Sequence, residues 1–387
     1  MAGIDISETQ VRRLAHEIGA ELIAQRDQKA VAHRRRQLTP RTEVVPEAVV
    51  VEVDGGRIRT RSADAGPGVH DAQNKEDKVA CLATLCGPTF TADPCPEPPE
   101  SFQCPRRVQR LVQQMKGQAS ETAAQEIPAE STDPAPRSTC TSEEKRWSPE
   151  RLVRTCVASM GTSTSFGPLM AAEAQERRFY EARRRAFVAD GSAYNWSIHS
   201  GYFGDFEPIT DFLHAICYVY SAAHAVSVDE ACGWSQYLVW LRACWQGRVG
   251  DVLVALDACQ ERLGDPPAED ERSAVVSRDP RRVVYQARTY LRNNQKRMAY
   301  PRYRQAGLPT TSSLVESLVG EVNARVKSKQ KYWTRLAGCE SILQLRAAVL
   351  SQDDRLDHFF AQRDGCPFRK RPTASNESEN QLTQTAA

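Results

Sequence analysis

The stretch TEVVPEAVVVEVDGGRIRTR, residues 42–61, decides the fold that the sequence predicts. Its first part is rich in β-branched residues, which favour strands, and the Gly-Gly pair that follows is typical of a two-residue hairpin turn. We therefore expect residues 49–53 and 57–61 to pair as antiparallel strands, with Asp54 at the end of the first one. The run KVACLATL at 78–85 predicts a third strand.

Two further strands and a helix are expected in the middle of the chain. The apolar run at residues 186–189 predicts a strand that stops at Asp190, and NWSIH at 195–199 suits another short strand. A proline is favoured in the first turn of a helix, so Pro208 predicts the start of a helix that runs to Val226.

Helical periodicity is present in several other segments. It covers residues 6–37 and 171–185, and the region 231–300 is mostly helical without a strand signal. The hydroxyl side chains of TTSS at 310–313 can cap a last helix, which we expect to run to about Tyr332. These elements predict an α/β fold, a mixed sheet with flanking helices.

Changes of composition divide the chain. Residues 92–149 hold nine of the 22 prolines, which disfavours a continuous core there. The expected division is a helical arm at 1–45, an α/β core at 46–91, 180–229 and 305–350, a Pro/Ser/Thr-rich insert with a helical lead-in at 92–179, an α-helical insert at 230–304, and a basic, disordered tail at 351–387.

The composition excludes several classes of protein. Hydrophobic residues make up 41% and charged residues 26% of the 387, which is ordinary for a globular chain and unlike collagen or a wholly disordered protein. Without an apolar signal segment or a run of 18 apolar residues, we expect a cytoplasmic protein with no membrane partner. The only local cluster of cysteines, Cys81, Cys86, Cys95 and Cys104, lacks the CxxC spacing of zinc sites, so reduced thiols are expected.

Three acids have a context that suggests chemistry. Asp54 and Asp190 end predicted strands, and Glu316 lies in the first turn of a predicted helix. Carboxylates gathered at one place repel one another unless a cation lies among them, and Mg²⁺ and Mn²⁺ prefer such oxygen ligands. Two such ions can carry out phosphodiester chemistry. The simpler readings are a turn residue for each aspartate and a helix-dipole partner for Glu316.

Other polar residues are candidates for supporting roles. Asp211 and His214 lie three residues apart on one helical face, where they could hydrogen-bond to each other or act at the site. Candidate contacts to phosphate are the basic side chains of Arg57, Arg59, Lys327 and Lys331. Arg57 and Arg59 alternate on the predicted strand, so we expect them to share one face next to Asp54. For the arginines the alternative is salt bridging, and for the lysines a solvated charged face.

Five blocks of the sequence carry a resemblance to a known family. They are VEVDGGRIRTR at 51–61, KEDKVACLATL at 75–85, RAFVADGSAYNWSI at 185–198, PITDFLHAICYVYSAAHAV at 208–226 and YRQAGLPTTSSLVESLVGEVNARVK at 303–327. In order and content they resemble the DDE transposases of bacterial insertion sequences, of the ISKra-like group. The resemblance covers most of residues 50–330.

The resemblance implies a ribonuclease H-like catalytic core that cuts transposon ends and joins them to target DNA. It implies Asp54, Asp190 and Glu316 as the catalytic triad and as ligands of two Mg²⁺ or Mn²⁺ ions. The implied partners are double-stranded DNA, as element ends and as target, and further copies of the chain on that DNA.

The chain departs from the family at two places. Thr311-Ser312-Ser313-Leu314 replaces the family's Gly-Ser-Gly before the third acid, and the chain begins where the family's N-terminal DNA-recognition region is expected to have ended. Two alternatives stay open. One is a nuclease of the same fold, and the other is a DNA-binding remnant of a transposase without catalysis.

Overall fold

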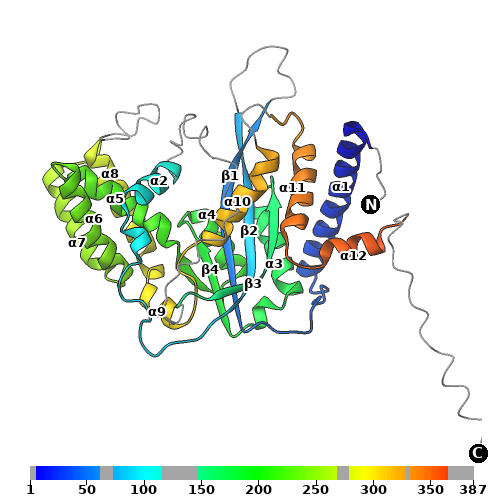
Figure 1. Cartoon of the computed structure of the whole chain (residues 1–387), viewed down its shortest axis with the longest axis horizontal. Coiled ribbons are helices and arrows are strands. Elements are labelled where there is room, and N and C mark those ends of the chain that lie inside the picture. The colour runs from blue at the N-terminus through cyan, green and yellow to red at the C-terminus, as the bar shows by residue number, and fades with distance from the viewer. Residues whose placement is uncertain (1–5, 62–72, 116–146, 268–278, 328–331, 365–387) are drawn as a thin grey trace, which may run out of the picture.

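A five-stranded mixed sheet forms the centre of the molecule, in a computed structural model that describes residues 6–61, 73–115, 147–267, 279–327 and 332–364 (Figure 1). The strands are β1 (Ala48–Thr60), β2 (Gln73–Cys86), β3 (Glu150–Ser159), β4 (Arg184–Ala189) and β5 (Glu207–Thr210), in the spatial order β3-β2-β1-β4-β5. The β1–β2 and β2–β3 pairs are antiparallel, whereas β1–β4 and β4–β5 are parallel. This arrangement confirms the mixed α/β class.

Helices cover both faces of the sheet and its β3 edge (Figure 1). They are α1 (Glu8–Arg34), α2 (Pro105–Met115), α3 (Ser163–Glu176), α4 (Ala193–Tyr202), α5 (Phe212–Val226), α6 (Glu230–Trp245), α7 (Val249–Leu263), α8 (Pro280–Asn294), α9 (Tyr300–Gln305), α10 (Ser313–Val326), α11 (Leu336–Leu350) and α12 (Arg355–Gln362). No helix among the described residues is long and apolar enough to cross a membrane.

Alternation along β1 divides the core into two layers. Val50 and Ile58 face the layer that contains α5 and α10, and Val51 and Val53 face the layer that contains α3 and α4. Successive side chains of a strand point to opposite faces, so Asp54 lies on the same face as Val50 and Ile58. The helices α6 to α9 extend the first layer into the helical part at the left of Figure 1.

The expected hairpin at the Gly-Gly pair is wrong, because β1 runs straight through it. Gly55 pairs with Lys78 and Gly56 with Asp77, without a break in register. A Cβ atom on Gly56 would lie 2.5 Å from Asp77 Oδ1 and 2.6 Å from Asn323 Nδ2. The glycine therefore gives α10 and β2 room beside β1 rather than making a turn. Asp54 consequently lies within the strand and not at its end.

Two other expectations around β4 need correction. Residues 195–199 belong to helix α4, not to a strand, and their apolar members Trp196 and Ile198 pack into the core layer of α3 and α4. Pro208 lies in β5, and α5 begins only at Phe212. Pro208 has no backbone N–H, but β5 is an edge strand, so the absence of this donor does not break the sheet.

Strand β3 was not expected, since its residues 150–159 fall in the segment assigned to an insert and lead-in. The helix expected at 171–185 is displaced toward the N-terminus, because α3 ends at Glu176 and β4 begins at Arg184. The last predicted helix also ends early, at Val326 instead of about Tyr332.

The segment expected to be a disordered tail contains a docked helix. Helix α12 is held by Arg355, whose guanidinium bonds the buried carboxylate of Glu173 at 2.6 Å and that of Asp353 at 2.7 Å. A basic residue in a polar sequence can therefore serve as an anchor, which composition alone does not reveal. Residues 365–387 of the tail lie outside the described part of the chain.

Candidate metal centre

Asp54, within β1, and Asp190, directly after β4, lie at the same level of two neighbouring parallel strands. Val53 of β1 pairs with Ala189 of β4, and the next residues are the two acids. Asp54 Oδ1 accepts a hydrogen bond from its neighbour Gly55 N at 2.7 Å. The two strands thus place the first two predicted acids next to each other.

The side chain of Asp190 is oriented by the start of α4. Its Oδ1 accepts hydrogen bonds from Ser192 N at 2.9 Å and from Asn195 Nδ2 at 2.8 Å. The carbonyl oxygen of Asp190 accepts a third bond, from the hydroxyl of Tyr290 in α8, at 2.9 Å. Helix α8 of the helical part therefore holds the end of β4 in place.

Glu316 lies in the first turn of α10, as expected, and α10 packs on the same face of β1 as Asp54. The Glu316 carboxylate accepts a hydrogen bond from Ser312 Oγ at 3.2 Å. The buried stripe of this helix contains Val315, Leu318 and Val322, and Glu316 lies beside this stripe.

Asp211 is fully buried and accepts hydrogen bonds from two separate segments. Its carboxylate caps α5, with Leu213 N at 3.1 Å and His214 N at 3.3 Å, and it also accepts from Ser312 N at 3.0 Å. The His214 ring nitrogen Nδ1 lies 2.6 Å from Asp211 Oδ2. Asp211 thus joins the N-terminus of α5 to the residue that precedes α10.

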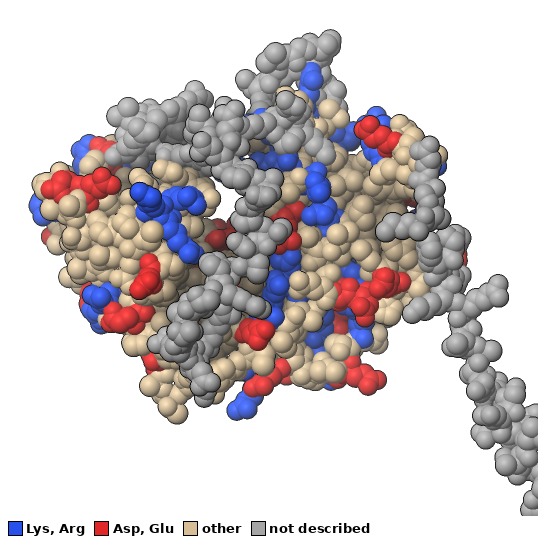
Figure 2. Space-filling view, in the orientation of Figure 1, with Lys and Arg blue, Asp and Glu red and all other residues tan. Residues whose placement is uncertain are grey.

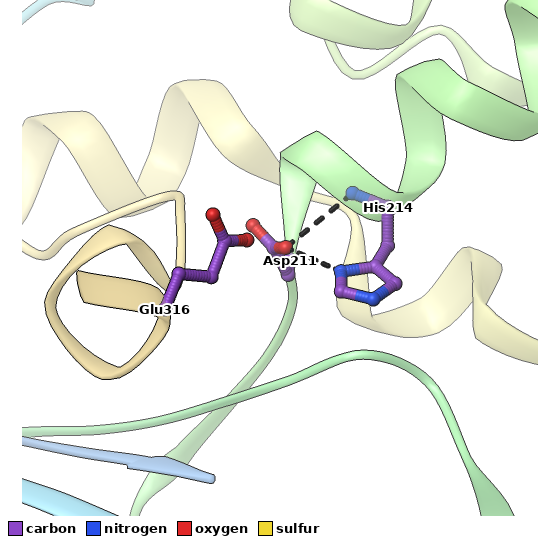
Figure 3. Close-up of side chains that lie close together, drawn as sticks. All are labelled: Asp211, His214 and Glu316. Carbon is purple, nitrogen blue, oxygen red and sulfur yellow. Dashed lines mark hydrogen bonds and ion pairs between the residues drawn. The ribbon is translucent and has the colours of Figure 1, made fainter. Parts of the chain in front are cut away.

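A tight group of potential metal ligands in the described part of the chain comprises Asp211, His214 and Glu316, whose ligand atoms lie within 4.8 Å of one another. Figure 3 shows the Asp211 carboxylate between Glu316, which comes from α10, and His214, which comes from α5. The expected supporting pair therefore lies near the third predicted acid. Asp54 and Asp190 lie outside this tight group, but their charges act on it.

Burial and neighbouring charges shift the pKa values of Asp54 and Glu316. Burial raises the pKa of Asp54, and the charges of Asp190 and Asp211 raise it further. Burial and the charges of Asp211 and Asp54 raise the pKa of Glu316 to about 7, although His214 opposes this shift. The five residues consequently form one electrostatic cluster.

His214 is the cation of this cluster. Burial lowers the pKa of His214, but its bond to Asp211 and the charges of Asp190 and Asp54 raise it more, to about 9. Burial also raises the pKa of Asp211, and the hydrogen bond and charge of His214 more than reverse that effect. At neutral pH the pair is therefore an imidazolium next to a carboxylate.

Three of the predicted phosphate contacts belong to β1 and to the end of α10. Alternation along β1 places exposed Arg57 and half-buried Arg59 on the face opposite to Asp54, which corrects the expectation that they lie beside it. Lys327, the C-cap residue of α10, is exposed. Burial raises the pKa of Asp77 to about 6, and the charge of Lys327 opposes this shift. Lys331 lies outside the described residues.

Acidic and basic side chains are mixed on the face of the molecule that contains α10. Figure 2 shows acidic groups in a hollow near the centre of this face and basic groups around it. The acids are therefore concentrated at the centre of this face and the cations lie around them.

Sequence reasoning missed Glu52, Asn195 and Ser312 as parts of the site. Glu52 is fully buried on β1 and accepts a hydrogen bond from Val315 N at 2.8 Å. Its signal was a charged residue within the apolar run VVVEV, which predicts a buried carboxylate with a partner. Asn195 was assigned to a strand, which gave no reason to pair it with Asp190.

Comparison with models of known protein families finds no match for this chain, and comparison with curated proteins finds none either.

Proposed function

We propose that this chain is a DDE-type transposase that cuts DNA at the ends of an insertion sequence and joins the 3′ ends to target DNA. The observation that carries the proposal is the placement of Asp54 and Asp190 at the same level of two parallel strands, with Glu316 on the helix above them. A ribonuclease H-like core requires a mixed sheet with flanking helices, and the sheet described above supports it.

The acids suit a pair of hard divalent cations. All three offer carboxylate oxygens, which Mg²⁺ and Mn²⁺ prefer. The raised pKa values of Asp54 and Glu316 are the result of burial and mutual repulsion, and both effects decrease when a cation binds. Asp54, Asp190 and Glu316 would hold the ions. Bound there, the ions would activate the attacking water or 3′-hydroxyl and stabilise the leaving oxygen.

The protein residues around these acids have separate tasks. Asn195 and Ser192 orient Asp190, and Ser312 orients Glu316. The imidazolium of His214 supplies positive charge next to the acids, where it can balance a scissile phosphate. Asp211 fixes the direction of that ring by accepting a hydrogen bond from Nδ1, and Nε2 is turned away from Asp211 (Figure 3).

A strand-transfer assay tests the proposal. Labelled duplexes that carry the DNA flanking the gene on each side are incubated with the protein, Mg²⁺ and a supercoiled plasmid. The proposal predicts labelled DNA joined to the plasmid, and predicts that Asp190→Asn abolishes the product. The control Asp205→Asn changes an exposed acid outside the cluster and should leave the product unchanged.

The same assay separates the alternatives. Nicked or cut DNA without joined product would indicate a nuclease of the same fold. Retention of the labelled DNA without any Mg²⁺-dependent change, in wild type and Asp190→Asn alike, would indicate a DNA-binding remnant. Either result would contradict the proposed strand transfer. The expected oligomer on DNA is tested by the mass of the complex.

A further inference from the structure

Helix α10, which carries Glu316, lacks the usual side-chain cap from the residue that precedes it. The first N–H groups of a helix need acceptors, and the side chain of the N-cap residue normally accepts from the third residue of the helix. Ser312 occupies the N-cap position of α10, yet its side chain makes no such bond. Its hydroxyl instead donates to Glu316 Oε1 at 3.2 Å.

The missing cap is supplied from β1. Glu52 Oε2 accepts from Val315 N, the N–H that an N-cap side chain would bond, at 2.8 Å. Glu52 is 0% exposed and lies 263 residues away in the chain. Both Glu52 and Asp54 are on the same face of the same strand, because they are two residues apart.

We propose that Glu52 is the N-terminal cap of α10 and thereby positions Glu316 over Asp54. One strand then carries the first acid and also fixes the helix that carries the third. The substitution of a distant cap for the local one releases the Ser312 hydroxyl to orient the Glu316 carboxylate. Glu52 is a positioning residue in this account, since it acts through α10. The expected effect of Glu52 on metal binding rests on the proposed function. The capping of α10 by Glu52 does not depend on that function.

Two variants of nearly equal shape isolate the hydrogen bond. Glu52→Met keeps the side-chain length in a buried site and removes the acceptor. Glu52→Gln keeps an acceptor oxygen at the same distance and should rescue the cap. The control Val51→Ala removes packing from the neighbouring position on the opposite face of β1, so it reports general destabilisation alone.

Hydrogen exchange of the peptide that covers residues 311–317 tests the cap without any metal. Loss of an N-cap interaction typically costs about 1 kcal/mol, so exchange should become roughly fivefold faster in Glu52→Met. It should change less than about twofold in Glu52→Gln and in Val51→Ala. Equal exchange in Glu52→Met and wild type, or equal acceleration in Glu52→Met and Glu52→Gln, would overturn the proposal.

Calorimetric titration with Mn²⁺ tests the consequence for the site. Removal of a residue that orients a ligand weakens metal binding by about 10–100-fold, which we expect for Glu52→Met but not for Glu52→Gln. Unchanged affinity in Glu52→Met would overturn the positioning of Glu316. A wild-type protein that binds no Mn²⁺ would overturn the proposed function and the positioning role, while the exchange result would still decide whether Glu52 caps α10.

Discussion

Val53 of β1 pairs with Ala189 of β4 in parallel register, and this pair determines where the two acids that follow them lie. Asp54 and Asp190 are 136 residues apart in the chain but adjacent in the sheet. Because the strands are parallel, the two acids lie at the same level of the sheet, and the charge of Asp54 acts on Glu316 in the first turn of α10. The proposed chemistry depends on this adjacency.

Asp190→Asn should remove Mg²⁺-dependent cleavage while the fold is kept. The amide oxygen can still accept from Ser192 N and Asn195 Nδ2, but the negative charge is lost. Loss of a ligand should cost more than the 10–100-fold that loss of an orienting partner costs, so we expect a decrease of more than about a hundredfold. Initial rates on labelled duplex measure this, with the urea midpoint as a check of folding. A rate within tenfold of wild type would exclude Asp190 as a ligand.

The metal-free protein should lose stability as the pH rises from 6.5 to 9. The pKa of His214 is raised from 6.5 to about 9 in the fold, so its contribution is complete below pH 6.5 and is lost as the pH rises through 9. The shift corresponds to about 3 kcal/mol. Urea unfolding at pH 6.5 and at pH 9 measures it, and the difference should be smaller by about that amount in His214→Gln. The same pH dependence in both proteins would show that His214 is not the cation of the cluster.

Gly56→Ala should destabilise the protein and displace α10. The added methyl group would meet Asp77 and Asn323, and an overpacked core position costs about 1–3 kcal/mol. Gly320→Ala is the matched control, because it lies in α10 with nothing within 4 Å of the added Cβ. Alanine has the higher helix propensity, so this control should stabilise by up to about 1 kcal/mol. A neutral Gly56→Ala in urea unfolding would contradict the close approach of α10 to β1.

Arg355→Ala should remove the ion pair with Glu173 that holds α12 and lower the free energy of unfolding. Burial raises the pKa of Glu173, but the charges of Arg355 and Arg177 lower it below its usual value, so Glu173 is ionised and buried. Removal of the partner of a buried charge costs about 3–5 kcal/mol. Arg248→Ala breaks an exposed pair with Asp251 and should cost less than about 1 kcal/mol. Equal urea midpoints for the two variants would show that α12 is not anchored by Arg355.

The sequence predicted the elements with strong local patterns and failed where distant contacts decide. The apolar run at 186–189 and the start of the helix that carries Glu316 have strong local signals, and both elements were found there. The expected local cap was not found, because the side chain of Ser312, the N-cap residue, makes no cap hydrogen bond. The Gly-Gly pair has the composition of a turn, yet Asp77 and Asn323 make glycine necessary there for another reason. No local pattern contains that information.

The same limit applies to the candidate site. The contact between Asp211 and Ser312 joins residues 101 positions apart, and the cap supplied by Glu52 spans 263 positions. A sequence without a structure cannot pair them. The resemblance predicted the three acids, but it did not predict that Asp211 and His214 would lie with Glu316 in a group whose ligand atoms are within 4.8 Å of one another.

Titration of the protein with Mn²⁺, followed by calorimetry and electron paramagnetic resonance, tests the central claim most directly. If Asp54, Asp190 and Glu316 hold a pair of ions, wild type should bind two Mn²⁺ ions that are magnetically coupled, and Glu316→Gln should lose the coupled pair while Asp205→Asn keeps it. Absence of Mn²⁺ binding in wild type, or an identical coupled signal in Glu316→Gln, would contradict the claim.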